Sequence, residues 1–303
     1  TARAVDGVSI AVAAPAGADV RAQLMSGIEN LDVTSAEAPA KVNDIYVVQA
    51  GTGTNQIGRF DIMVDTDRNA IDSFTWQIIP IDDSHCPRDR EVENFIRHYR
   101  DVTSQKYDRI VTRFAHELTH PKRNQETSLG NLIADILRDS FAIDLMLMGS
   151  GAIRSEVLGP VVHYGDLVEC LPYDDAVYML KVTGTQLERM IRHILREDAF
   201  VGEHTEFYQF SHGMRIVWSR SAQAFRELTL DGEPLHADRL YTVAMQKYHY
   251  TNLKPFLDIT LEEAEENGKT SVLSTSARDV VEEYITVNQH LAREVEGRLV
   301  VEA

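Results

Sequence analysis

The chain of 303 residues is 44% hydrophobic and 25% charged, which is typical of a globular protein with one large core or two modest ones. Its net charge of −17 argues against a long nucleic acid as a partner, because a polyanion would be repelled. No apolar run reaches the roughly 18 residues that a membrane-spanning helix needs. Two cysteines, Cys86 and Cys170, are too few for a disulfide framework.

The first part of the chain, to about residue 82, is predicted to be β-rich with one helix. Short β-branched and apolar runs predict strands at 8–12, 45–49, 57–64 and 71–79. The spacing of apolar residues predicts a helix over 18–28. Pro, Asp and Ser in 80–90 indicate a linker, and one apolar face over 91–99 predicts a connecting helix.

From about residue 106 onward, helices and strands are expected to alternate. Apolar runs predict strands at 110–114, 144–148, 176–182, 207–210, 215–218, 227–230, 241–245 and 298–301. Thr127 or Ser128 is placed to cap a helix that runs to about residue 141. Thr183-Gly184-Thr185-Gln186 fits a capping box at the start of another helix, and a last helix is expected over 276–287.

A glycine turn follows the strand expected at 144–148. In Gly149-Ser150-Gly151-Ala152, small residues let the backbone approach a ligand closely. Arg154, just beyond, can present a planar fork to a carboxylate, a phosphate or a ribose oxygen. The string alone fits a tight surface turn with a solvated arginine better, because short glycine motifs are common.

Two further features are compatible with a small anionic ligand. Lys122-Arg123-Asn124-Gln125-Glu126 stands directly before a predicted helix start, where free backbone N–H groups favour anions. Taken alone, the string fits a polar loop better. Tyr173 and Tyr248 lie in predicted loops far apart in sequence and could hold a flat base by stacking. The alternative is a pair of unrelated, half-buried tyrosines.

Several strings occur in a fixed order along the second part of the chain. They are Arg123-x-x-Glu126, Leu129-Gly130-Asn131-Leu132, Gly151-x-Ile153-Arg154, Gly165-Asp166-Leu167, Leu171-Pro172-Tyr173 and Val182-Thr183-Gly184. Their order and spacing are far more specific than any one of them. Together they resemble the C-terminal, substrate-binding domain of the 5′-nucleotidase family.

The resemblance implies an α/β (α+β) fold: a 5′-nucleotidase-like domain of the four-layer α/β type over 106–303. A linker helix over 88–105 would precede it, and 1–87 would be a β-rich remnant of the metallophosphatase domain. By the same resemblance, Arg123 and Arg154 would bind the ribose or terminal groups of a nucleotide, and Tyr173 and Tyr248 would stack on the base. Gly149 and Gly151 would line the site; Gly149 stands where the family often has Asn.

A Gly-Gly-Asp-Gly string usual in the family is missing near Asn252-Leu253-Lys254-Pro255-Phe256, which leaves base and sugar selectivity undetermined. The family's two-metal centre is also missing from the sequence. A complete family member is expected to hold two divalent metal ions with Asp, His and Asn ligands, yet no His precedes His85. We therefore expect a truncated member with no catalytic residues and no cofactor of its own, which does not hydrolyse phosphate esters alone.

One competing metal signal is His116-Glu117-Leu118-Thr119-His120, which matches the H-E-x-x-H string of zinc peptidases. On a helix, His116 and His120 would share a face and bind zinc. Pro121 disfavours a helix at this point, and the preceding residues have strand character. A solvated strand end with chance histidines is the favoured interpretation.

The function expected from these features is the nucleotide- or nucleoside-binding part of a 5′-nucleotidase-like metallophosphoesterase, a hydrolase of nucleotide catabolism. The alternative is a non-catalytic binding module derived from that family, and a zinc peptidase ranks below both. The expected partner is a small nucleotide or nucleoside. No export signal is visible, although family members are often periplasmic or on the cell surface, and the oligomeric state stays undetermined.

Overall fold

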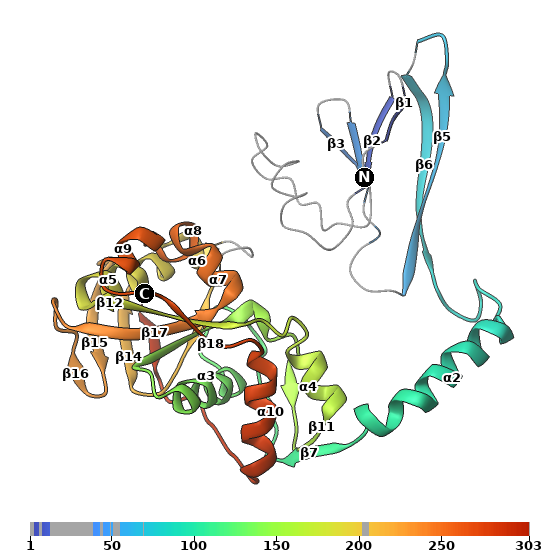
Figure 1. Cartoon of the computed structure of the whole chain (residues 1–303). Helices are drawn as coiled ribbons and strands as arrows, with labels where there is room; N and C mark the ends of the chain where they lie inside the picture. The colour runs from blue at the N-terminus through green and yellow to red at the C-terminus, as the bar shows by residue number, and fades with distance from the viewer. Residues whose placement is uncertain are drawn as a thin grey trace. The chain divides into compact units, whose positions relative to one another are not determined.

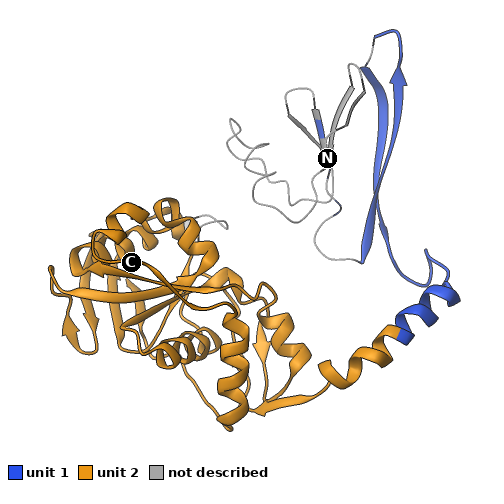
Figure 2. Cartoon of the chain, viewed as in Figure 1, with its two compact units in different colours: residues 1–98 blue, residues 99–303 orange. Residues whose placement is uncertain are grey.

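The structure is a computed structural model that describes residues 3–5, 8–12, 39–42, 45–48, 50, 55–68, 70–201 and 206–302. The chain divides into two compact units, Thr1–His98 and Tyr99–Ala303 (Figure 2). The boundary falls inside helix α2 (Arg90–Tyr107). The helix predicted over 18–28 lies outside the described residues.

The described part of unit 1 before α2 consists of strands. A four-stranded sheet has the order β1–β2–β4–β3, in which β2 and β4 run parallel and the other pairs antiparallel. The strands are β1 (Arg3–Val5), β2 (Val8–Val12), β3 (Ala40–Val42) and β4 (Ile45–Val48). The predicted strands at 8–12 and 45–49 are confirmed.

A long antiparallel hairpin of β5 (Gln56–Asp65) and β6 (Ala70–Pro80) completes unit 1. Aromatic rings pack along it: Phe60 contacts Phe74 with ring centroids 5.3 Å apart and Trp76 at 5.9 Å. Edge-to-face pairs of this kind stabilise a sheet beyond the apolar area they bury. Both strands were predicted from their composition.

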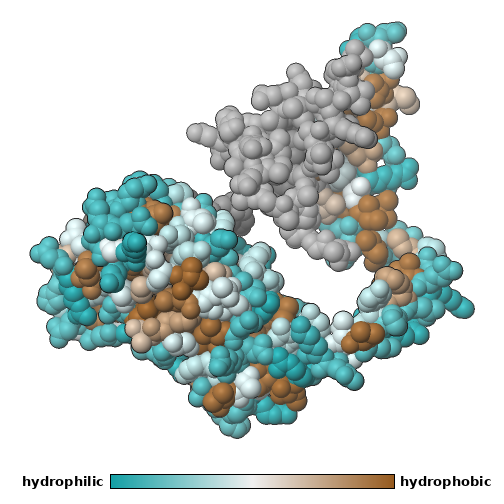
Figure 3. Space-filling model, in the orientation of Figure 1, coloured by the Kyte–Doolittle hydropathy of each residue, from teal (hydrophilic) through white to brown (hydrophobic). Residues whose placement is uncertain are grey.

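Helix α2 is longer than the prediction of 91–99, since no Gly or Pro interrupts the sequence before Tyr107. The carboxylate of Asp89 caps its start by accepting from the backbone N–H groups of Glu91 and Val92. No residue of α2 is buried, and the side chains of Phe95 and Val102 are each more than three-fifths exposed. Brown residues recur along this segment in Figure 3, while hydrophilic residues cover much of unit 2 in that view.

Unit 2 is built on a five-stranded sheet of order β13–β9–β17–β12–β18 (Figure 1). Only β9 and β17 pair in parallel. The strands are β9 (Leu145–Gly149), β12 (Val177–Thr183), β13 (Tyr208–Phe210), β17 (Leu240–Gln246) and β18 (Ser271–Ser274).

Both faces of this sheet are buried. Along β9, Met146 and Met148 point into one apolar cluster and Leu145 and Leu147 into the other, as the alternation of a strand requires. Helices α3 (Ser128–Phe141) and α10 (Ala277–Val287) contribute to the first cluster. Helix α5 (Gly184–Ile194) and a second sheet contribute to the other.

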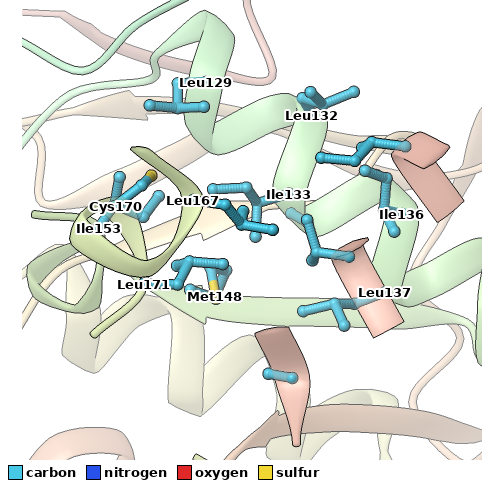
Figure 4. Close-up of a cluster of buried hydrophobic side chains, with 14 of the residues drawn as sticks. Leu129, Leu132, Ile133, Ile136, Leu137, Met148, Ile153, Leu167, Cys170 and Leu171 are labelled. Carbon is cyan, nitrogen blue, oxygen red and sulfur yellow. The ribbon is translucent and has the colours of Figure 1, made fainter. Parts of the chain in front are cut away.

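Helix α3 shows why the sequence folds as predicted. The Thr127 side chain accepts from the backbone N–H of Gly130, and Ala142 ends the helix with φ of 51°. Its apolar side chains lie on one side, against residues that include Met148 and Ile153 (Figure 4). The stripe predicted from the sequence is therefore the core stripe.

The second sheet has the order β16–β15–β14–β19, with β14 and β19 parallel. Its strands are β14 (Met214–Ser219), β15 (Ala224–Leu230), β16 (Glu233–Pro234) and β19 (Leu299–Glu302). The capping box of α5 is present, because Thr183 and Gln186 exchange side chain-to-backbone hydrogen bonds. The predicted α/β fold class is confirmed.

The remaining elements are short. They are β7 (Ile110–Arg113), β8 (Leu118–Thr119), η1 (Ser150–Ala152), β10 (Val157–Leu158), β11 (Val161–His163), α4 (Tyr164–Cys170), α6 (Asp198–Val201), α7 (Lys247–Thr251), α8 (Leu253–Leu257) and α9 (Leu261–Glu265). Only β7 was predicted among them. Within the described ranges, no helix has the length and apolar character to cross a membrane.

Candidate functional site

A pocket of about 440 Å³ opens in unit 2 where several chain segments end. The parallel strands β9 and β17 end at the same edge of the sheet, at Gly149 and Gln246, and this kind of edge is where α/β folds commonly bind ligands. The volume falls within the range of roughly 300–1,000 Å³ that small-molecule sites occupy.

Five of the six residues predicted to bind a ligand line this one pocket. They are Arg123, Gly151, Arg154, Tyr173 and Tyr248. These residues come from segments up to 125 positions apart in sequence (248 − 123), so only the tertiary fold brings them together. The sixth, Gly149, is not among the residues that line it.

The glycine turn is anchored and is not a free surface loop. The buried Ser150 donates its backbone N–H to the carbonyl of Phe207, at 2.8 Å. Gly151 leaves room for Arg123: a Cβ at this position would lie 3.4 Å from Nη1 of that arginine. The Arg154 backbone N–H donates to the carbonyl of Cys170 at 2.9 Å, which fixes where its side chain starts.

The two arginines keep most of their donors available. Among the described residues, Arg123 forms no hydrogen bond or ion pair. Arg154 makes only a long contact of 3.4 Å from Nη1 to the carbonyl of Gly151. Each guanidinium carries five N–H donors and stays charged at neutral pH. The pocket therefore presents cationic donors whose partners are still to be supplied.

Both tyrosine rings are accessible at the pocket. The Tyr173 side chain is 64% exposed and that of Tyr248 is 46% exposed. Tyr248 rests against Phe256, with ring centroids 5.5 Å apart, and its backbone N–H donates to Asp175 at 2.8 Å. Exposed aromatic faces at a pocket are suited to stacking on a flat heterocycle.

The loop that carries Tyr173 is also held in place. Asp174, the next residue, has φ of 46° and accepts from Nη2 of Arg278 at 2.9 Å. Arg278 belongs to α10, so that helix fixes the turn on which Tyr173 stands. The ring is thus presented by a defined backbone.

Four further polar residues line the pocket and were not predicted: Asp175, Glu206, Gln246 and His249. Burial raises the pKa of Glu206, and the nearby Arg123 acts in the opposite direction. Asp175, Gln246 and His249 stand within three positions of the predicted tyrosines, and this proximity was the available signal. Glu206 carries no such signal in the sequence.

Gly149 lies against His249 instead of lining the pocket. A Cβ on Gly149 would overlap the imidazole at Nε2. Glycine is therefore required by the packing of His249. The resemblance implied that Gly149 lines the site. In the structure, Gly149 instead leaves room for the imidazole of His249, which lines the pocket.

The H-E-x-x-H string does not form a helix. Leu118–Thr119 is strand β8, and the partly buried His116 has Nε2 3.1 Å from Glu294. Both ring nitrogens of His120 are already engaged, by the Thr127 hydroxyl at 2.8 Å and the Ser150 carbonyl at 3.0 Å. The helical geometry needed for the zinc-peptidase alternative is absent, and that alternative is set aside.

A two-metal centre does not fit the residues whose positions are described here. Among them, no group of three or more His, Cys, Asp or Glu side chains is arranged to hold a metal ion. We therefore assign no ligands to the two divalent ions of a complete family member, and route no chemical step through them.

Comparison with known proteins gives the family. Residues 106–256 match the family model described as 5′-nucleotidase, C-terminal domain. Over 213 residues, the chain is 24% identical to endonuclease YhcR of Bacillus subtilis, covering 70% of this chain and 17% of that protein. Over 231 residues, it is 21% identical to a 5′-nucleotidase of Vibrio vulnificus, covering 70% of this chain and 40% of that protein.

A separate, shorter similarity links 53 residues of the chain to the flagellar P-ring protein of Rhizorhabdus wittichii, at 57% identity. It covers 18% of this chain and 13% of that protein.

Among solved structures, a 5′-nucleotidase precursor from Thermus thermophilus superposes with a TM-score of 0.65 at 17% identity. The match covers 88% of this chain and 54% of that one, so the chain spans about half the length of this structure and less of the curated relatives named above. At this identity the likeness concerns the fold. Through residues 106–256, the chain belongs to the 5′-nucleotidase family by its C-terminal domain.

Proposed function

We propose that the pocket of unit 2 binds a nucleoside or nucleotide, with the base stacked on the tyrosine rings and the sugar or phosphate held by the guanidinium groups. The observation that carries the proposal is the gathering of Arg123, Arg154, Tyr173 and Tyr248 around one cavity. Stacking on an aromatic ring contributes about 1–3 kcal/mol per base and tolerates several bases. Arginine suits oxyanions because its planar fork matches their geometry.

Relatives named as 5′-nucleotidases support this assignment, since the match includes the domain that contains the pocket. In a complete member, we infer that this domain orients the nucleotide while a metal centre cleaves the ester. Positioning of this kind lowers a barrier by several kcal/mol. The second candidate is a binding module without catalysis, and it would apply if the sequence given, which has none of the family's metal-ligand strings, were the whole protein.

Isothermal titration of the full chain with adenosine, AMP and UMP tests the binding. We expect Tyr173→Ala to weaken adenosine binding by about 1–3 kcal/mol, and Arg154→Ala to weaken AMP binding more than adenosine binding. The exposed His236, which lies outside the pocket, supplies the control His236→Ala. Wild-type affinity for all three ligands in both pocket variants would refute the assignment.

Phosphate release from AMP with added Mn²⁺ tests whether this polypeptide has a catalytic centre of its own. Both candidates give no release above that of the metal alone, whereas a turnover that scales with protein concentration would contradict both.

A further inference from the structure

Two polar groups at the pocket lack the partners that buried polar groups normally have. Gln246, the last residue of β17, lines the pocket and is only 4% exposed. Its Oε1 atom is buried and has no hydrogen-bond partner among the described residues. Most buried polar side-chain atoms are paired, so this oxygen is an unused acceptor as far as the described residues are concerned.

The second group is the imidazole of His249, which is 3% exposed. Its Nδ1 lies 2.9 Å from the hydroxyl of Tyr208, a residue that is 1% exposed. That hydroxyl has no other hydrogen bond within the described residues, so it donates to Nδ1 to avoid an unpaired buried proton. With Nδ1 accepting, the ring proton of the neutral imidazole resides on Nε2.

Two pKa shifts agree with a neutral imidazole beside a protonated phenol. Burial lowers the pKa of His249 to about 4, so the ring is uncharged at neutral pH. Burial also raises the pKa of Tyr208 well above its ordinary value, so the phenol keeps its proton. Nε2–H is therefore a donor, and no acceptor for it is found in the described part of the chain.

Nε2 lies beside Gly149, and a Cβ there would overlap it. The glycine thus keeps open the position that the imidazole occupies. His249 lines the same pocket as Gln246, and no hydrogen bond joins the two side chains. Besides the two arginines, His249 and Gln246 thus give the pocket a donor and an acceptor that no described residue pairs, within four residues of sequence.

We propose that His249 and Gln246 read the edge of the bound base, with Nε2–H of His249 donating to a ring acceptor and Oε1 of Gln246 accepting from an N–H group of the base. The inference rests on the proposed function and adds to it the chemical class of the ligand: a nitrogen heterocycle with both an acceptor and an N–H donor at its edge. A base that lacks either group leaves a buried polar atom unpaired, which is the strongest way for a site to reject an analogue.

Adenosine analogues test each hydrogen bond separately. The 1-deaza, 3-deaza and 7-deaza forms each remove one ring acceptor, and purine riboside removes the amino group, which is the base's only N–H donor. With the wild-type chain, we expect one deaza form and purine riboside each to bind about tenfold more weakly than adenosine, which corresponds to loss of one hydrogen bond.

The variant for His249 is the double substitution Tyr208→Phe/His249→Phe, which removes the buried hydroxyl together with its acceptor and so leaves nothing unpaired. It should bind the sensitive deaza form and adenosine equally. The matched control, Tyr208→Phe alone, keeps the imidazole and should keep the penalty. For Gln246, the near-isosteric Gln246→Met should bind purine riboside and adenosine equally while still discriminating the deaza form.

The outcomes distinguish a failure of the edge-reading role from a failure of the proposed nucleoside binding. A wild-type chain that binds adenosine and all four analogues equally, or a double variant that keeps the deaza penalty with an unchanged melting temperature, overturns the edge-reading role alone. A wild-type chain that binds none of adenosine, AMP and UMP overturns the proposed function, and this inference falls with it.

Discussion

Unit 2 contains two groups of polar side chains that are built in opposite ways. Asp135 and Arg298, 2% and 3% exposed, are fully paired: the two groups form hydrogen bonds of 2.6 and 2.9 Å, and Asp135 also accepts from Arg293 at 2.8 Å. At the pocket, by contrast, Gln246 and His249 are as deeply buried and keep atoms without partners among the described residues.

The difference separates polar groups that stabilise the fold from polar groups that, under the proposed function, would pair with a ligand. Burial would raise the pKa of Asp135, but Arg298 holds it below its ordinary value, so the carboxylate stays charged and paired. An unpaired buried group destabilises the free protein. A ligand that forms a hydrogen bond with the group would remove this destabilisation. Substitutions in the first group should therefore change stability, and those in the second should change binding.

The largest effect is expected from Asp135→Asn. Removing the charge leaves the buried Arg298 with the half-exposed Glu296 as its only carboxylate partner among the described residues, which costs about 3 kcal/mol of unfolding free energy. Urea denaturation followed by circular dichroism measures it. Glu188→Ala breaks an exposed pair with Arg192 and should change stability by less than about 1 kcal/mol. Equal losses in the two variants would remove the distinction between buried and exposed pairs.

The next largest effect is the loss of stability at acid pH that is due to His249. Its pKa in the folded chain, about 4, lies below the ordinary value of 6.5, so the unfolded chain takes up the proton first. Its contribution to stability is therefore complete above pH 6.5 and falls as the pH drops towards 4, by about 1.4 kcal/mol per pH unit.

Urea denaturation at pH 7, 6 and 5 should show a shallower loss for His249→Gln than for wild type. The lowered pKa of the buried His120 adds a slope that is common to both. The exposed control His236→Gln should follow the wild-type slope, and an unchanged slope in His249→Gln would contradict the buried, neutral imidazole.

Gly149, which lies against His249, and Gly151, which lines the pocket, offer a matched pair with a smaller effect. Gly149→Ala places a methyl group on the imidazole of His249 and should destabilise the chain by about 1–3 kcal/mol, as overpacking does. Gly151→Ala puts its methyl group at ordinary contact distance from Arg123, with little expected change. Melting temperatures compare the two; a Gly149→Ala chain as stable as wild type would show that His249 can move away.

The smallest effect concerns Glu206. Its carboxylate lies in the pocket near Arg123, so Glu206→Gln removes repulsion towards a phosphate. We expect AMP to bind more tightly by about 1 kcal/mol or less, with adenosine unchanged. Titration at low salt resolves this difference. Weaker AMP binding would mean that the carboxylate positions the arginine.

Local signals in the sequence were sufficient for much of unit 2. The caps at Thr127 and Thr183 and the apolar run before Gly149 predicted α3, α5 and β9. Short elements such as α4 and α7 were missed, because seven and five residues give too little periodicity. The apolar face predicted only 91–99 of α2, whereas the resemblance implied a linker helix over 88–105; the helix ends at Tyr107.

The candidate ligand site was likewise predicted only in part from the sequence. The resemblance in ordered motifs selected Arg123, Arg154, Tyr173 and Tyr248, each as a separate candidate. It gave no indication of Glu206, and it assigned to Gly149 a contact that packing gives to His249. Gly149 and His249 are 100 positions apart in sequence (249 − 149), so no local pattern could pair them.

The sequence by itself determined most of the longer helices and strands and the types of side chain available, because caps and periodicity act over a few residues. The tertiary structure decided which of those side chains share a cavity and which are left without partners. That outcome depends on contacts between distant segments, as where β17 brings Gln246 and His249 beside the end of β9. Hydrogen-bond pairing is a property of the assembled fold.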